Sequence, residues 1–338
     1  MDRLTEVVLP GVVEPEGLLV QERPIPSPGP GQALVQVVAT GVSFAELQMR
    51  KGRYYDQPAF PFVPGYDLVG VVTAAADPAL VGQRVAALTK IGGWTTHAII
   101  DTTDLVAVPD EVDATYAEAV VTNGITAWQM LHRKARVRAG QTILVHGANG
   151  GVGSLLAQLA LIAGVRVIGT ASSQHHEELR ALGITPVDYR TEDVPARVRE
   201  LAPGGVDAVF DNVGGQNLDD AWALLRRGGS VVSYGVASAV DGNGSAMLGV
   251  LKVLGRMWWW NTVPNGRRAY FYNLWAGRTF TRGRFTARLR KDLGAVFDLL
   301  ASGQLSPRIA ATLPLSQIAD AMKLAETRTA VGKIVLIP

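Results

Sequence analysis

The sequence of 338 residues contains no cysteine. This absence excludes disulfide bonds, thiolate nucleophiles, iron–sulfur clusters and thiolate zinc sites. The sequence also has no uninterrupted apolar run long enough to span a membrane, and its first residues lack the basic and apolar regions of a secretory signal. We therefore expect a soluble, cytoplasmic protein. The net charge of only +2 gives no general reason to expect binding to nucleic acid.

The chain divides into two regions of different pattern. Short β segments separated by proline and glycine extend to about residue 119, which indicates a compact antiparallel barrel interrupted by one helix at 44–51. Helices are then expected at 116–121 and 127–131, followed by alternating strands and helices. The expected strands are 142–145, 165–168, 185–187, 208–210 and 229–234. This alternation predicts a parallel sheet covered by helices on both faces, and the tail at 309–337 is expected to return to the barrel.

A glycine-rich turn follows the first strand of the alternating region. It reads His146-Gly147-Ala148-Asn149-Gly150-Gly151-Val152-Gly153 and leads directly into an apolar helix. A helix N-terminus offers unpaired N–H groups and a partial positive charge, and glycines let phosphates approach the backbone. The turn therefore predicts a dinucleotide site, although turns with a purely structural role also collect glycine.

The second strand of this βαβ unit ends in Ala171-Ser172-Ser173-Gln174, and no acidic residue follows before Glu177. A site for NADH usually has Asp or Glu there, which accepts a hydrogen bond from the ribose 2′-hydroxyl. An acid would repel a 2′-phosphate, whereas hydroxyl groups and the nearby His175, His176 and Arg180 tolerate it. We therefore predict NADPH as the cofactor.

Further motifs lie along nearly the whole chain. They are Gly65-Tyr66-Asp67-Leu68-Val69-Gly70, Val81-Gly82-Gln83-Arg84-Val85, Gly92-Gly93-Trp94, Asn123-Gly124-Ile125-Thr126-Ala127 and Val331-Gly332-Lys333-Ile334-Val335-Leu336. Together with the glycine turn they resemble the medium-chain dehydrogenase/reductase superfamily, and within it the zinc-independent quinone oxidoreductases. The resemblance implies an α/β protein with a GroES-like β-barrel catalytic domain at 1–122 and 276–338. It also implies a Rossmann domain with a doubly wound parallel sheet at 123–275, and a cleft that holds NADPH.

The resemblance also bears on metal binding. Zinc-dependent alcohol dehydrogenases of the superfamily hold their catalytic metal through Cys, His and Cys, and these positions match Ser43, Tyr66 and Asn123 in this chain. Neutral hydroxyl and amide groups do not hold Zn²⁺ against water as thiolate and imidazole do. A zinc-activated alkoxide mechanism is therefore excluded on chemical grounds. The adjacent His175 and His176 are expected to be solvated, because neighbouring side chains on a helix point apart.

A nicotinamide hydride can still be delivered to an electron-poor carbon without a metal. Quinones and α,β-unsaturated carbonyls suit this reaction because the developing negative charge lands on an oxygen that hydrogen-bond donors can meet. The resemblance implies that Tyr54 lines the nicotinamide end, where relatives carry a candidate proton donor. The alternative is a barrel tyrosine with a satisfied hydroxyl. Ser43 and Asn123 complete the predicted catalytic set.

The predicted cofactor-binding residues lie in the glycine turn, at the strand ends and on the interdomain helix. They are Thr126, Gly147, Asn149, Gly150, Gly151, Val152, Gly153, Thr170, Ser172, Ser173, Tyr189, Asn212, Gly235 and Arg328. Of these, the resemblance implies that Tyr189 packs at the adenosine end and that Arg328 lies near the cofactor.

Residues 250–291 form a segment rich in arginine, lysine and aromatic residues that contains no acidic residue. Three interpretations remain open. The segment is a substrate lid or pocket wall, because aromatic residues line ligand clefts and Arg binds carboxylate or phosphate. It is a dimer surface, where aromatics and Arg are also enriched. Or it contacts anionic lipid.

These observations predict an NADPH-dependent, metal-free reductase acting on a quinone or a conjugated enone, present as a homodimer. Two alternatives stay open. One is an enoyl-thioester reductase of the polyketide or fatty-acid type. The other is an NADPH-binding protein with little turnover that associates with lipid or with a partner.

Overall fold

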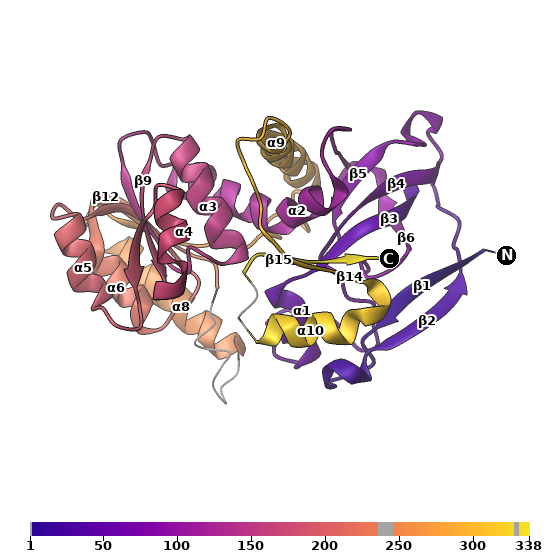
Figure 1. Ribbon diagram of the computed structural model, residues 1–338, viewed down its shortest axis with the longest axis horizontal. Helices are drawn as coiled ribbons and strands as arrows, with labels where there is room; N and C mark the ends of the chain where they lie inside the picture. Colours follow the sequence, from indigo (N-terminus) through magenta and orange to yellow (C-terminus); the bar gives the residue numbers. More distant parts are fainter. Residues whose placement is uncertain (1, 236–245, 328–330) are drawn as a thin grey trace. The chain divides into compact units, whose positions relative to one another are not determined.

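The computed structural model describes residues 2–235, 246–327 and 331–338, and Figure 1 traces its helices and strands. The chain divides into two compact units, one of Met1–Ile125 with Gly277–Pro338 and one of Thr126–Ala276. The predicted boundaries, after residues 122 and 275, lie within a few residues of these divisions. Each unit is built around a sheet of its own.

The first unit contains a seven-stranded sheet with the order β14-β15-β3-β4-β5-β7, in which β6 also pairs with β3. Its strands are β3 (Gln32–Val42), β4 (Asp67–Ala75), β5 (Arg84–Leu88), β6 (His97–Asp101), β7 (Val106–Ala107), β14 (Ile309–Pro314) and β15 (Lys333–Ile337). All neighbours are antiparallel except β14 and β15. The strand β15 pairs with β3, so the tail of the chain returns to the N-terminal sheet as predicted. The strands β1 (Arg3–Val8) and β2 (Leu19–Pro24) form a separate antiparallel pair in the same unit.

Helices of the first unit follow or connect these strands. They are η1 (Pro15–Gly17), α1 (Phe44–Arg50), η2 (Pro78–Leu80), η3 (Thr102–Asp104), α9 (Arg282–Ala301), η6 (Leu315–Gln317) and α10 (Ile318–Glu326). The helix α1 ends just before Gly52, whose φ of +64° suits a glycine that terminates a helix. The helix α9 begins at Arg282, inside the basic and aromatic segment 250–291, and ends at Ala301.

The second unit contains a six-stranded sheet with the order β10-β9-β8-β11-β12-β13, and every neighbouring pair is parallel. Its strands are β8 (Thr142–Val145), β9 (Arg166–Ala171), β10 (Thr185–Asp188), β11 (Val206–Asp211), β12 (Leu225–Ser233) and β13 (Arg268–Phe271). Its helices are α3 (Gly151–Ile162), η5 (Ser173–His175), α4 (His176–Ala181), α5 (Val194–Leu201), α6 (Gln216–Leu224) and α8 (Ala246–Thr262). This arrangement is the predicted doubly wound parallel sheet.

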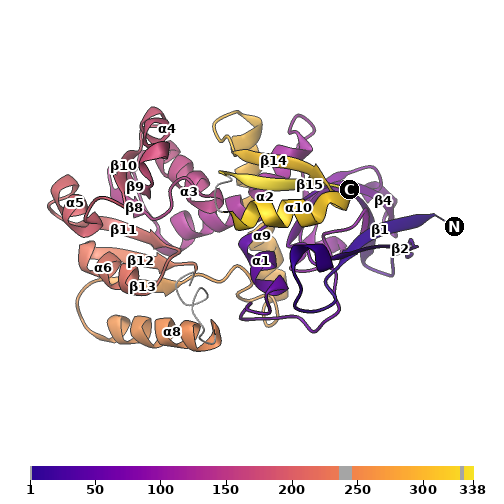
Figure 2. The same ribbon diagram turned by 60° about the horizontal axis from the view of Figure 1, so that its bottom comes forward.

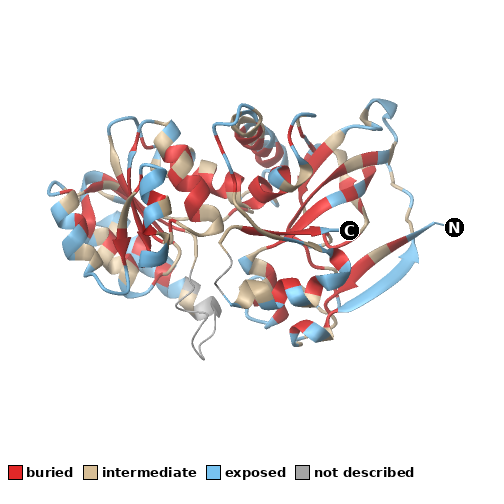
Figure 3. Ribbon diagram, in the orientation of Figure 1, coloured by how far each residue is buried: buried red, intermediate tan, exposed pale blue. Residues whose placement is uncertain are grey.

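Helices cover both faces of the parallel sheet (Figure 2). On one face, residues of α5, α6 and α8 share a buried cluster with the strands, including Val198, Leu218 and Met257. The helices α3 and α4 lie on the other face. Figure 3 shows that buried residues concentrate in the strands of both units. No helix among the described residues is both long and apolar enough to cross a membrane.

One prediction about the chain that connects the two sheets is wrong. The two short helices expected at 116–121 and 127–131 are one helix, α2 (Ala114–Trp128), which continues as the π-helix η4 (Gln129–Ala135). Gly124 looks like a break in the sequence, but a Cβ there would lie 2.8 Å from Cβ of Val120 and 3.0 Å from a methyl group of Val296 on α9. The glycine therefore permits close packing and does not end the helix.

The segment 250–291 is also not a single structural feature. It contains most of α8, the edge strand β13 and the first part of α9, and it crosses from the second unit into the first. Its basic and aromatic residues therefore have several different surroundings.

Candidate functional site

The glycine turn joins β8 to α3 and leaves the N-terminus of α3 open. Gly150 is the N-cap of this helix, with no side-chain capping bond and no acidic residue in the first turn. Gly147 has a φ of +64°, and a Cβ on Gly153 would lie 2.2 Å from the carbonyl oxygen of Gly147. Gly150 N–H donates to the same oxygen over 2.9 Å. The backbone thus folds so tightly that only glycine fits at Gly153, and it presents backbone N–H groups and positive dipole charge as an anion site.

The carboxyl ends of β11 and β12 bring two more predicted residues to this turn. Asn212 follows β11, and a Cβ on Gly147 would lie 3.4 Å from its Nδ2. The Oδ1 atom of Asn212 is buried and has no hydrogen-bond partner among the described residues. A Cβ on Gly235, after β12, would lie 2.6 Å from the carbonyl oxygen of Asn212. An orphaned polar atom beside an open helix N-terminus fits a dinucleotide, which brings hydrogen-bond donors and phosphates to the ends of parallel strands.

His146 is a buried residue of this region that the sequence analysis did not include in the site. Its Nδ1 lies 3.4 Å from Oγ1 of Thr170, which accepts a hydrogen bond from Gly147 N–H over 3.1 Å. Its Nε2 has no partner among the described residues, and burial lowers the pKa of His146 to about 4. The imidazole is therefore neutral at physiological pH. Thr170, which was predicted, holds both the histidine and the first residue of the turn.

The expected adenosine end is formed by the neighbouring ends of β9 and β10. Ser173 N–H donates to Oδ2 of Asp188 over 3.2 Å, and Arg190 N–H donates to Oδ1 over 2.9 Å. Hydrogen bonds from Arg190, Thr191 and Ser173 hold the pKa of Asp188 below its usual value. Tyr189 is half exposed, and the Arg190 guanidinium lies 5.7 Å from its ring centre.

Several residues predicted at this end have roles that differ from the expectation. His176 is buried with Nε2 3.1 Å from the carbonyl oxygen of Ala171, so the prediction that both adjacent histidines are solvated is wrong for His176. Ser172 is also buried. Arg328 lies outside the described residues. The remaining predicted cofactor residues lie in the turn or on α2: Asn149, Gly151 and Val152 in the turn and the start of α3, and buried Thr126 on α2.

In the first unit, Ser43 and Glu46 form a capping box at the start of α1. The Glu46 carboxylate accepts from the Ser43 hydroxyl and, over 2.9 Å, from Ser43 N–H. Its other oxygen accepts from Tyr66 N–H over 2.7 Å. Burial raises the pKa of Glu46 to about 7, although the Ser43 hydrogen bond and the Lys333 charge oppose this rise. The hydroxyl of Ser43, predicted as catalytic, is therefore engaged within its own helix cap.

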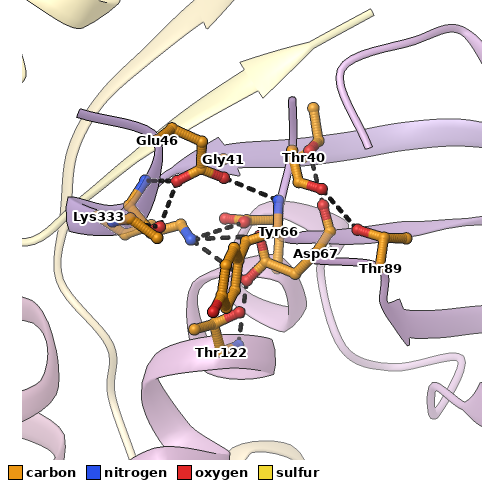
Figure 4. A network of polar contacts seen from close by, with 12 residues as sticks. Thr40, Gly41, Glu46, Tyr66, Asp67, Thr89, Thr122 and Lys333 are labelled. Atoms are coloured by element: carbon orange, nitrogen blue, oxygen red, sulfur yellow. Dashed lines mark hydrogen bonds and ion pairs between the residues drawn. The ribbon is translucent and has the colours of Figure 1, made fainter. Parts of the chain in front are cut away.

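Next to this cap lies a buried lysine between two buried carboxyl groups (Figure 4). Lys333 Nζ on β15 lies 3.3 Å from Asp67 on β4 and 3.1 Å from Glu118 on α2, and all three side chains are at most 3% exposed. Burial raises the pKa of Glu118 well above its usual value. Burial alone would lower the pKa of Lys333, but the surrounding carboxylates outweigh it and raise the pKa. The same oxygen of Asp67, Oδ2, also accepts from Thr122 N–H over 3.1 Å, which fixes the residue that precedes Asn123.

Tyr54 and Tyr66 form a pair of hydroxyl groups beside this network. Their oxygen atoms are 2.6 Å apart, and their rings meet edge to face at 6.5 Å between centres. Tyr66 is 6% exposed, whereas Tyr54 is only half-buried. Burial raises the pKa of Tyr54 above its usual range. Tyr54 therefore keeps its proton at neutral pH and can act as a hydrogen-bond donor.

The residues at the positions of the zinc ligands do not fit a zinc ion. The Ser43 hydroxyl is engaged with Glu46 and the Tyr66 hydroxyl with Tyr54, and neither group, nor the amide of Asn123, is a donor that competes with water for Zn²⁺. Within the described ranges, no three His, Asp or Glu side chains are grouped in a way that would hold a metal ion.

Three of the arginines of segment 250–291 form ion pairs with acidic residues. Arg282 Nη2 lies 2.5 Å from Asp101 and 3.1 Å from Asp104, and Arg278 Nη2 lies 3.3 Å from Asp104. Arg256 pairs with Asp219 at 2.7 Å. The local excess of positive charge in the sequence is thus partly neutralised by acids from other parts of each unit. This weakens the interpretation of the segment as a lid of free arginines for an anionic substrate.

Two family models match the chain. "Alcohol dehydrogenase GroES-like domain" matches residues 29–122, and "Zinc-binding dehydrogenase" matches residues 182–336. The human protein named "Synaptic vesicle membrane protein VAT-1 homolog" is 32% identical over 342 residues, which covers 98% of this chain and 86% of that protein.

Solved structures of similar proteins cover the whole length of the chain. A quinone oxidoreductase of Pseudomonas syringae is 29% identical, has a TM-score of 0.84, and covers 99% of this chain and 100% of its own. A mycobacterial protein complexed with NADPH is also 29% identical, has a TM-score of 0.81, and covers 99% of this chain and 100% of its own.

Proposed function

The chain belongs to the medium-chain dehydrogenase/reductase superfamily, in its quinone oxidoreductase-like branch, and we propose that it reduces a quinone or an α,β-unsaturated carbonyl with NADPH. The single observation that carries this proposal is the open N-terminus of α3 beside the orphaned Oδ1 of Asn212. The two features together suit a pyridine dinucleotide at the ends of the parallel strands.

Different residues of the chain have different roles in this reaction. The turn at Gly147–Gly153 binds the pyrophosphate through backbone N–H groups, and Asn212 accepts a hydrogen bond from the cofactor. When bound, the nicotinamide supplies a hydride for an electron-poor carbon. Tyr54 donates a hydrogen bond to the substrate oxygen on which negative charge develops. The reaction needs positioning and hydrogen-bond donors, and it needs no metal ligand.

The preference for NADPH over NADH rests on the end of β9. Residues 172–174 carry hydroxyl and amide groups and no acid that would repel a 2′-phosphate. Asp188 lies close by, but its oxygens accept hydrogen bonds from Ser173 and Arg190, which offset its charge. Arg190 adds an exposed cation at the same edge.

The proposal is tested by cofactor binding and by turnover. Fluorescence titration should give a lower Kd for NADPH than for NADH, and NADPH oxidation should be followed with a panel of quinones, enones and enoyl thioesters. Turnover with quinones or enones is expected, and turnover restricted to enoyl thioesters would favour the thioester reductase instead. Absence of binding to both reduced cofactors would refute the proposal. A preference for NADH would refute its NADPH part.

A second candidate function is association with an anionic lipid surface, and one observation favours it. The outward face of α8 exposes Trp258 (69%), Trp259 (61%), Leu251 (54%) and Leu254 (42%), while Val253 and Met257 are buried against the sheet. Exposed tryptophans with neighbouring cations such as Lys252 suit a membrane interface. The relative named as a synaptic vesicle membrane protein supports this candidate.

Co-sedimentation with vesicles tests the lipid candidate. The chain should sediment with vesicles that contain phosphatidylserine, and less with neutral vesicles or at high salt. Serine at both Trp258 and Trp259 should abolish sedimentation, whereas Phe280→Ser, which removes another fully exposed aromatic ring, should leave it unchanged. No sedimentation with any vesicle would eliminate this candidate.

A further inference from the structure

The hydroxyl of Tyr54 does not lie alone beside the substrate position that the proposed function gives it. The Tyr66 oxygen is 2.6 Å from it, close enough for a strong hydrogen bond between the two phenols. One of the two hydroxyl groups must donate to the other. Because Tyr66 is 6% exposed and Tyr54 is only half-buried, the outer position in the pair belongs to Tyr54.

The backbone of Tyr66 is held on both sides. Its N–H donates to Glu46 over 2.7 Å, and its carbonyl oxygen accepts from Thr89 N–H over 2.9 Å and from Lys90 N–H over 3.3 Å. The hydroxyl of Thr89 in turn donates to the carbonyl oxygen of Gly65 over 2.6 Å. Figure 4 shows Tyr66 within this network of polar contacts, between Glu46 and Asp67. A side chain on such a fixed backbone keeps its hydroxyl in one place, as a preorganised donor requires.

We propose that Tyr66 is a second member of the proton-donating pair: it donates its O–H to the oxygen of Tyr54, and Tyr54 gives its own proton to the reduced substrate. The inference rests on the proposed function and adds to it a residue that sequence comparison treats only as a lost zinc ligand. Tyr66 acts through Tyr54, so it is a positioning residue.

The balance of the step is simple. Hydride leaves the reduced cofactor, which is thereby oxidised, and forms a new bond to the enone or quinone. The π electrons that this addition displaces move onto the substrate oxygen and give an enolate or hydroquinone anion. The O–H bond of Tyr54 then breaks, and its proton forms a new bond with this anion. The electron pair stays on the oxygen of Tyr54, where the O–H of Tyr66 stabilises the negative charge until a proton from solvent replaces the one lost.

The environment explains why a partner is needed. Burial raises the pKa of Tyr54, and in the resting pair the hydroxyls of Tyr66 and Tyr55 raise it further. The phenolate that forms during the step is therefore costly unless the Tyr66 O–H, 2.6 Å away, is directed at it as a donor. A hydrogen bond to a charged oxygen contributes more than one to a neutral oxygen, so Tyr66 stabilises the product of proton transfer more than the resting state.

The test compares Tyr66→Phe, Tyr54→Phe and the double variant that carries both changes. The control is Tyr116→Phe, which removes the hydroxyl of a half-exposed tyrosine on α2. We expect Tyr66→Phe to lower kcat by about tenfold or more while Kd for NADPH stays within about twofold. The double variant should be no slower than Tyr54→Phe alone, because the two hydroxyls act in sequence. The ratio of kcat in H₂O to kcat in D₂O should rise in Tyr66→Phe, since proton transfer becomes slower. A purely structural role would not change this ratio.

Thermal unfolding and NADPH binding show whether Tyr66→Phe is folded. If it is not, 3-fluorotyrosine at position 66 makes the donor more acidic with little change in packing, and kcat should then rise. Equal kcat in Tyr66→Phe and the unaltered chain, or effects that add in the double variant, would overturn the inference while leaving the reductase intact. An unaltered chain that oxidises NADPH with no member of the acceptor panel would instead refute the proposed function, and the role of Tyr66 with it.

Discussion

Replacement of the buried lysine, Lys333→Met, removes one positive charge and keeps most of the side-chain volume. In the unaltered chain Nζ lies 3.3 Å from Asp67 and 3.1 Å from Glu118, and both carboxyl groups are fully buried. Without the lysine, the two acids face each other with no cation beside them. Loss of one partner from a buried ion pair typically costs about 3–5 kcal/mol, because the remaining charge is left uncompensated.

The cost should also depend on pH in a definite direction. In the variant, the folded state binds protons on its buried carboxyl groups more tightly than the unfolded state does, so its free energy of unfolding falls as the pH rises. Burial already raises the pKa of Glu46 to about 7 and that of Glu118 well above its usual value, which gives the folded state groups that take up these protons. The difference in free energy of unfolding between the unaltered chain and Lys333→Met should therefore become smaller as the pH is lowered from 8 to 5.

Urea unfolding at several pH values measures both effects, and the thermal midpoint at neutral pH should fall by on the order of 10 °C. The matched control is Lys323→Met on α10, whose lysine pairs with Glu16 at the surface at 2.6 Å. Surface pairs contribute about 1 kcal/mol or less, so this control should change little. If Lys333→Met costs no more than the surface control, or if its deficit grows on acidification, the reasoning about the buried cluster is refuted.

Three further changes test other parts of the fold. Gly153→Ala should abolish NADPH binding in a fluorescence titration, because its Cβ would meet the carbonyl oxygen of Gly147 at 2.2 Å; a retained Kd would contradict the tight turn. Its control is Gly294→Ala in α9, where nothing lies within 4 Å of the new Cβ. This control should raise the free energy of unfolding, measured with urea, by about 1 kcal/mol. Gly41→Ala should cost about 3 kcal/mol in the same assay, because its Cβ would fall 2.2 Å from Cε of the buried lysine; a neutral effect would show that this packing is loose. The free energy of unfolding of the unaltered chain should fall as the pH is lowered from 6.5 towards 4. The reason is that His146 takes up a proton in the unfolded state, whereas the folded residue, with a pKa of about 4, does not. In His146→Leu, the free energy of unfolding should fall by roughly 3 kcal/mol less over the same interval.

The strand that the sequence predicted best lies between two glycines. The strand β8 has the predicted bounds, 142–145, and Gly140 and Gly147 lie just outside it. The errors occur where a local signal has two physical meanings. Asn123-Gly124 suggests a break, yet Gly124 lies inside α2 because Val296 of α9 needs the space that a side chain would fill. Such a requirement comes from a distant helix, and no local pattern expresses it.

The candidate site, like the fold, could be predicted from the sequence only in part. The glycine turn could be recognised because its chemistry is contained in consecutive residues. The buried cluster could not, because Glu46, Asp67, Glu118 and Lys333 come from four elements that are far apart in the sequence. Asp67, Glu118 and Lys333 are each a single charged residue in a largely apolar stretch, and Glu46 lies on a short helix that also carries Arg50. That is a weak signal of burial, since a charged side chain in that setting is more often at the surface.

Ser43 and Tyr66 show why the chemistry of a site depends on more than the identity of its residues. Comparison with zinc enzymes marks both positions only as ligands that are missing. In the structure, the Ser43 hydroxyl donates to Glu46, Glu46 accepts from the backbone of Tyr66, and the Tyr66 hydroxyl lies 2.6 Å from that of Tyr54. Each contact fixes the next, so a helix cap at one end restrains a phenol at the other. A substitution at Ser43 or Glu46 should therefore alter the chemistry at Tyr54 without touching the substrate, which separates this arrangement from a set of independent side chains.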